Sequence, residues 1–111
     1  MKTLKIYFQE IQKEDKTIKK IKNTIDSLLG MEEASKPGEA NLIISQGVKF
    51  LKTEYSRQKK YLILKTAWDK EFRDKKKPEN IFLYTPENAL SDFWITFNLI
   101  KEEKRAQEGN Y

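Results

Sequence analysis

The chain has 111 residues, a net charge of +5, 38% hydrophobic and 35% charged residues, and neither cysteine nor histidine. Its length fits one domain over 1–111, and its apolar and aromatic content is too high for a disordered chain. The missing residue types exclude disulfides, zinc sites built from nitrogen and sulfur ligands, and nucleophiles of the Cys–His or Ser–His kind.

The N-terminal segment predicts a helix over 3–29, because apolar residues recur every seven positions from Leu4 to Ile25. Gly30 is a natural C-terminal stop for that helix. A competing prediction stays open. Leu4, Ile6 and Phe8 alternate with other residues, so 3–8 could form a short strand, with Asp15 capping a helix over 16–29.

The middle of the chain continues the helical pattern after a loop. Residues 30–40 contain two glycines and a proline and are predicted to be that loop. A stripe from Ile44 to Tyr55 predicts a helix over 41–58, with Asn41 as its N-cap. A second stripe over 61–72 is rotated relative to the first, so the polar run 56–60 is expected to turn the chain into an antiparallel neighbour; one long helix that touches two partners is the alternative. A strand over Tyr61–Leu64 is a further alternative, although the spacing continues helically to Phe72.

The C-terminal part carries the clearest helix signal. Residues 79–84 form an apolar connection or a short strand. Thr85 is then a good N-cap and Pro86 suits the first helical position, which predicts a helix over 86–106. A frayed tail follows at about 107–111.

These elements predict a mostly α protein, a compact bundle of three to four helices. The alternative fold is a small α+β arrangement with short strands near 3–8 and 81–84. No apolar run is long enough for a signal peptide core or a membrane span, so we expect a cytoplasmic protein with no membrane partner.

The positive charge is concentrated in the middle of the chain. Residues 41–77 carry a net charge of +7, whereas 1–30 carry +3, 31–40 carry −2 and 78–111 carry −3. This basic segment predicts contacts with nucleic acid or an acidic protein surface. The residues expected to make them are Lys49, Lys52, Arg57, Lys59, Lys60, Lys65 and Arg73. The alternative is a solvated lysine-rich face without a ligand.

The aromatic residues offer a second kind of surface. Phe93 and Trp94 are adjacent, so their side chains diverge by about 100° around a helix and cannot both point into one narrow core stripe. One of them is a candidate for a protein interface, and Tyr61 is a further candidate. Burial in the core is the competing explanation for all three.

The sequence favours a non-enzymatic module that binds nucleic acid or a nucleic-acid-associated protein through its basic segment. The alternative is a protein–protein inhibitor or adaptor, of the phage or mobile-element type or an immunity-type helical bundle, which uses an aromatic edge. The neighbouring acids that could act together, Glu10 with Glu14, Asp69 with Glu71 and Asp74, and Glu102 with Glu103, each have a lysine or arginine within four residues, as on a solvated helix face. We therefore expect no catalytic residue and no metal site. We also expect no cofactor and no small-molecule substrate, and the sequence leaves homo-oligomers open.

Overall fold

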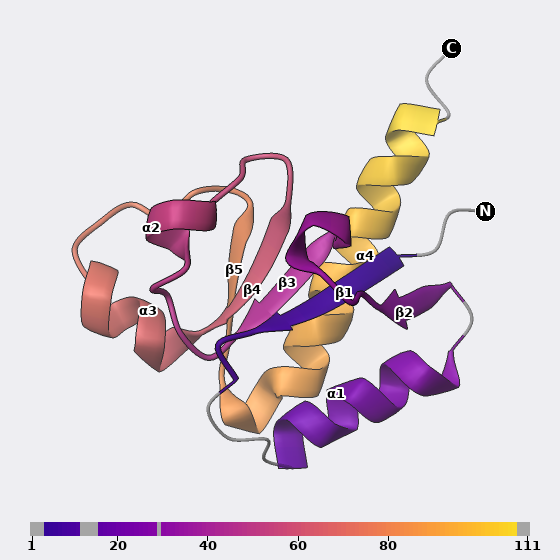
Figure 1. Ribbon diagram of the computed structural model, residues 1–111, viewed down its shortest axis with the longest axis horizontal. Coiled ribbons are helices and arrows are strands. Elements are labelled where there is room, and N and C mark those ends of the chain that lie inside the picture. The colour runs from indigo at the N-terminus through magenta and orange to yellow at the C-terminus, as the bar shows by residue number, and fades with distance from the viewer. Residues whose placement is uncertain (1–3, 12–15, 29, 109–111) are drawn as a thin grey trace.

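The computed structural model describes residues 4–11, 16–28 and 30–108, and the side chains as far as 103. These residues form five parallel strands and four helices, and each strand except β2 is followed by a helix (Figure 1). The elements are β1 (Leu4–Gln9), α1 (Lys16–Ser27), β2 (Met31–Glu33), β3 (Leu42–Ser45), α2 (Leu51–Glu54), β4 (Lys60–Leu64), α3 (Lys65–Phe72), β5 (Ile81–Tyr84) and α4 (Ala89–Glu108), with 3-10 turns at Pro37–Glu39 and Pro86–Asn88.

The strands form one sheet in the order β2-β1-β3-β4-β5. The chain starts near the middle of the sheet, builds outward to β2, returns past β1 to β3 and then builds in the other direction. This is the strand order of flavodoxin-like doubly wound sheets, in which the direction of winding reverses between β1 and β3. Every crossover brings the chain back to the same edge of the sheet, so all segments that precede a strand meet at one edge.

The predicted helical bundle is wrong, because the fold is α/β with a parallel sheet. The segments predicted as helices over 41–58 and 61–72 each begin with a strand. Leu42 to Ser45 are all buried, as are Tyr61 to Ile63. A parallel strand covered on both faces has a continuous apolar run, and the i, i+4 spacing from Ile44 to Val48 arose by coincidence within such a run.

The single helix predicted over 3–29 is wrong, because its first part forms β1. The alternative strands near 3–8 and 81–84 are present as β1, described from Leu4, and β5, but in an α/β sheet and not in the α+β arrangement expected with them. α1 then covers 16–27 and buries Ile18, Ile21 and Ile25. The proposed cap, Asp15, lies outside the described residues. Gly30 has a φ of 94°, the left-handed conformation expected after a helix end.

The predicted loop over 30–40 contains the edge strand β2 and a 3-10 turn. The helix predicted over 86–106 is present as α4, preceded by a 3-10 turn. Thr85 does not cap that turn through its side chain. Instead its backbone N–H donates to the Asp92 carboxylate at 3.2 Å. α4 reaches Glu108, so of the predicted frayed tail only 109–111 lie outside the described residues.

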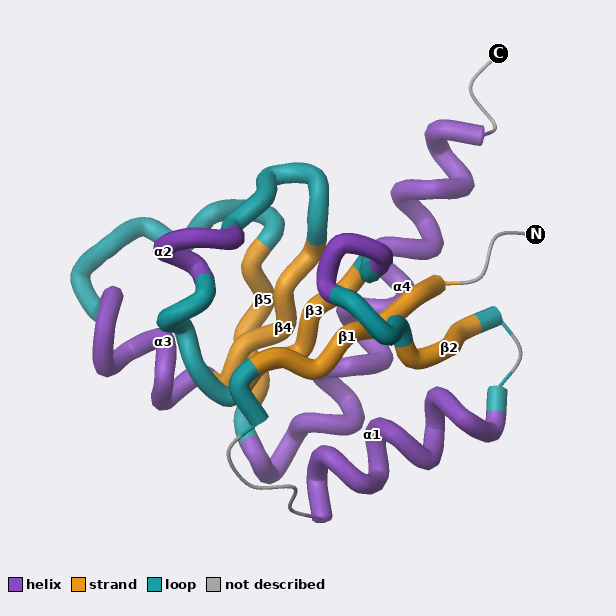
Figure 2. Tube along the Cα trace, in the orientation of Figure 1, coloured by secondary structure: helices purple, strands orange, loops and turns teal. Residues whose placement is uncertain are grey.

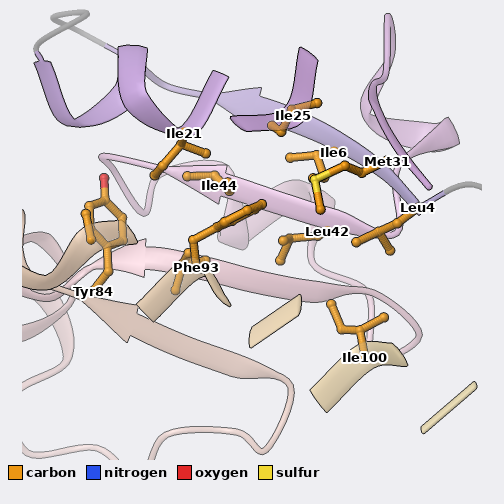
Figure 3. Packing of buried hydrophobic residues seen from close by; sticks show 12 residues of the cluster. Leu4, Ile6, Ile21, Ile25, Met31, Leu42, Ile44, Tyr84, Phe93 and Ile100 are labelled. Atoms are coloured by element: carbon orange, nitrogen blue, oxygen red, sulfur yellow. The ribbon is translucent and has the colours of Figure 1, made fainter. Parts of the chain in front are cut away.

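The sheet has a separate apolar core on each face. α1 and α4 cover one face, where Phe93 packs with Ile21, Leu42 and Ile44 (Figure 3). α2 and α3 lie toward the other face, over a core that contains Ile43, Tyr61, Ile63 and Trp68. Alternate residues of β3 and β4 therefore serve opposite cores. No helix among the described residues is long and apolar enough to cross a membrane.

Candidate functional site

Doubly wound sheets bind their ligands outside the carboxyl ends of the strands, where the winding direction reverses. Here that place lies between the ends of β1 and β3, and it is occupied by the side chain of Glu10. Glu10 has a φ of 49°, and its carboxylate accepts a hydrogen bond of 2.8 Å from the backbone N–H of Phe50. The carboxylate thereby joins the ends of two strands across the reversal point.

Gly47 leaves room for that carboxylate. A Cβ at position 47 would lie 2.5 Å from Oε1 of Glu10. Ser45, which is fully buried, fixes the backbone here, because its hydroxyl accepts from the Gly47 N–H at 3.0 Å and donates to the Gly47 carbonyl at 2.7 Å. The loop after β3 is thus built around the protein's own Glu10.

Two grooves lie at the opposite edge of the sheet, before the strands begin. The larger has a volume of about 530 Å³ and lies among the turn at 38–41, the loop at 56–60 and the α4 residues Ile100 and Glu103. The second has a volume of about 430 Å³ and lies between Tyr55 and the segment 78–80. Arg57 and Lys60 line both, so the two grooves adjoin at these side chains.

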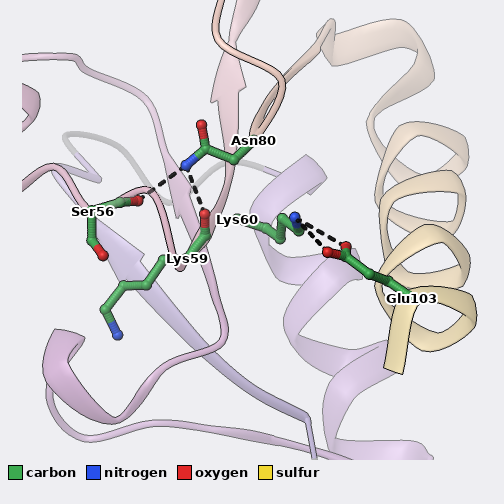
Figure 4. Close-up of polar contacts among 5 residues, drawn as sticks. All are labelled: Ser56, Lys59, Lys60, Asn80 and Glu103. Carbon is green, nitrogen blue, oxygen red and sulfur yellow. Dashed lines mark hydrogen bonds and ion pairs between the residues drawn. The ribbon is translucent and has the colours of Figure 1, made fainter. Parts of the chain in front are cut away.

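The loop over 55–59 is held in place by Asn80, which precedes β5. The buried Asn80 amide donates to the carbonyls of Ser56 and Lys59, at 3.0 and 2.8 Å (Figure 4). Its oxygen accepts from the Tyr55 hydroxyl at 2.6 Å. The loops before β4 and β5 consequently lie side by side (Figure 2).

Tyr61 holds the same loop from inside the core. Its hydroxyl accepts a hydrogen bond of 2.8 Å from the Ser56 N–H, and its ring stacks on Tyr55 with centroids 5.6 Å apart. Burial raises the pKa of the Tyr61 phenol, so the group stays neutral near pH 7. The backbone that carries Arg57 and Gln58 is therefore tied to two neighbouring side chains.

The three cations of this loop have different partners. The Lys59 ammonium donates to the carbonyls of Ala40 and Gly38, at 2.7 and 3.2 Å, and so ties the loop to the turn before β3. Lys60 forms an ion pair of 3.0 Å with Glu103 of α4 (Figure 4). The exposed guanidinium of Arg57 forms no hydrogen bond or ion pair with any described residue. It is the cation best placed to receive a ligand.

Positive charge gathers at this edge of the sheet. The segments that precede β3, β4 and β5 are 36–41, 55–60 and 73–80, which hold eight cations and three anions between them. Their net charge of +5 equals that of the whole chain. At the other edge, the described segments 10–11, 46–50 and 85–88 and the residue directly after β4 hold two cations and two anions, Lys49, Lys65, Glu10 and Glu87. The amino edge of the sheet is therefore the basic one.

No family model, curated protein or solved structure matches this chain. The site must therefore be interpreted from its own chemistry. Among the described residues, no group of three or more acidic side chains could hold a metal ion.

The structure divides the basic residues selected from the sequence. Arg57, Lys59 and Lys60 lie together at the amino edge, and the exposed Arg73 follows α3 in the segment that leads to β5. Lys49 and Lys52 belong to the loop after β3 and to α2. Lys65 follows β4 at the carboxyl edge and pairs with Asp69 at 2.6 Å.

The aromatic residues selected as interface candidates occupy different environments. Tyr61 and Phe93 are fully buried, one in each core. Trp94 is half-buried and packs edge-on against Phe97. Of the three, only Trp94 presents part of its side chain to solvent.

The sequence did not indicate that Asn80, its hydrogen-bond partner Tyr55, and Glu103 help to build this site. Asn80 is an ordinary loop residue by its sequence context, and Glu103 lies 43 positions from the lysine it pairs with. The only available signal was the short apolar run after Asn80, which identifies the strand that Asn80 precedes.

Proposed function

We propose that this protein is a non-enzymatic module that binds nucleic acid through its phosphates, at the amino edge of the sheet. The observation that carries the proposal is Arg57, whose guanidinium has no partner among the residues that the structure describes and lies on an anchored loop where two grooves adjoin. A guanidinium suits phosphate because its planar donors match two oxygens at once. The cytoplasmic setting expected from the sequence is part of this proposal.

The surroundings of Arg57 support a ligand with several negative charges. The net charge of +5 in the three segments at this edge attracts a polyanion over a distance and holds it by releasing counterions. Glu39, Glu79 and Glu103 also line the two grooves and repel an anion, so the attraction depends on Arg57, Lys60 and the net positive charge of the edge. The absence of histidine and cysteine favours binding without catalysis.

Fluorescence anisotropy with a labelled oligonucleotide of about 20 nucleotides tests the proposal, in single-stranded and duplex form. If three phosphates of a duplex are neutralised, affinity falls about fortyfold between 50 and 200 mM salt. Arg57→Ala should weaken binding about five- to tenfold and reduce the salt slope by about one. Glu103→Gln should strengthen binding about twofold, because it releases Lys60 for the ligand.

Matched control variants distinguish binding at this site from attraction by the overall positive charge of the protein. Lys19→Ala removes one exposed positive charge from α1, and Glu102→Gln removes a negative charge one residue before Glu103. Both should change the affinity less than twofold. Equal effects of Arg57→Ala and Lys19→Ala would contradict the site. Binding to an acidic protein but to no oligonucleotide would contradict the nucleic-acid partner.

A further inference from the structure

The two grooves at the amino edge differ in the side chains that line them. The described residues that line the larger groove include no aromatic one, whereas the second groove is lined by Tyr55 and Pro78 together with Arg57 and Lys60. Its volume of about 430 Å³ lies in the range of roughly 300–1,000 Å³ that is typical of sites for small organic molecules. The second groove therefore has room for a flat organic group beside the cations that attract phosphate.

Tyr55 is held at this groove by two contacts. Its hydroxyl donates to the Asn80 side chain at 2.6 Å, and its ring stacks on Tyr61 with 26° between the ring planes. Tyr55 is nevertheless only half-buried, so these contacts leave part of it accessible where it lines the groove. An aromatic side chain that is already fixed in place loses little conformational freedom when a flat ligand binds to it.

The charges around Tyr55 favour a base inside the groove and a phosphate at its border. Arg57 and Lys60 lie where the two grooves adjoin, whereas the exposed Glu79 lines the second groove alone. Glu79 repels a phosphate inside that groove but does not repel an uncharged base, and its carboxylate can accept a hydrogen bond from the amino group of a base. A phosphate bound to Arg57 would therefore bring its own base close to Tyr55.

We infer that the second groove binds one unpaired base, which stacks on Tyr55 while Arg57 binds the adjoining phosphate. The inference rests on the proposed function, because it names single-stranded nucleic acid as the ligand of the same edge. In a duplex the faces of each base are covered by its neighbours, so stacking on a protein side chain needs a base that is free of them. Such stacking tolerates different sequences, because every base has a π-face.

Fluorescence anisotropy with two labelled single strands of equal length tests the inference. One strand carries its bases, and the other is the same sugar–phosphate chain without bases. The strand with bases should bind the wild-type protein at least about fivefold more tightly, because stacking one base on an aromatic side chain raises the affinity by about that factor or more. Equal affinity for the two strands would overturn the base site and leave phosphate binding intact, whereas binding to neither strand would overturn both.

Variants of Tyr55 distinguish stacking from a purely structural role in the loop that carries Arg57. Tyr55→Leu should weaken binding to the strand with bases at least about fivefold and change the affinity for the strand without bases less than about twofold. Tyr55→Phe keeps the ring and should retain most of the affinity for the strand with bases. Tyr7→Leu is the matched control, because Tyr7 is also half-buried and packs against the same core, and it should change both affinities less than about twofold. An equal effect of Tyr55→Leu on the two strands, or no effect on either, would overturn the inference.

Discussion

Asn80 is the residue on which the geometry of the site depends most. Its side chain makes three hydrogen bonds within 3.0 Å, to Tyr55, Ser56 and Lys59, and these join the loops before β4 and β5. Arg57 lies within the loop that Asn80 holds. Loops that carry ligand contacts are most effective when a rigid scaffold positions them, and Asn80 provides that link here.

Asn80→Ala should lower the free energy of unfolding by about 2–3 kcal/mol, because three hydrogen bonds are lost and two carbonyls lose their donor. Urea denaturation at pH 7 measures this value. Asn23→Ala, an exposed asparagine on α1, should change it by less than about 0.5 kcal/mol. If the two variants were equally stable, the loop would be held by something other than Asn80.

At the scale of elements, local sequence patterns predicted some helices correctly but assigned two strands to helices. The amphipathic pattern of α1 and the start signals of α4 are local, so both helices could be predicted. β3 and β4 are short strands buried on both faces, whose apolar runs also fit a helical spacing. Their pairing with β1 and β5 depends on contacts between distant segments, which no local pattern reveals.

Ile43 distinguishes the strand from the helix that the pattern predicted. On a helix with Ile44 and Val48 in its stripe, Ile43 would lie about 100° from Ile44. In β3 both residues are buried, in opposite cores. Ile43→Ala and Ile44→Ala should therefore each cost about 2–4 kcal/mol in urea unfolding. A cost below about 1 kcal/mol for Ile43→Ala alone would support the helix.

At the scale of the molecule, the sheet separates three surfaces with different chemistry. The carboxyl edge is closed around Glu10, the amino edge is basic and grooved, and α4 presents an apolar face. The basic middle of the chain was visible in the sequence, including Arg57, Lys59 and Lys60. Their position at one edge was not, because it follows from the parallel topology, and neither was the pairing of Lys60 with Glu103.

We propose above all that nucleic acid binds at the amino edge of the sheet. Backbone amide chemical shifts, recorded while an oligonucleotide is added, test it most directly. We predict that the largest changes fall in 55–60 and 78–80, with the amides of Arg57 and Gln58 among them. Changes centred on Glu10, Gly47 and Phe50 would instead place the ligand at the carboxyl edge, and would contradict the claim.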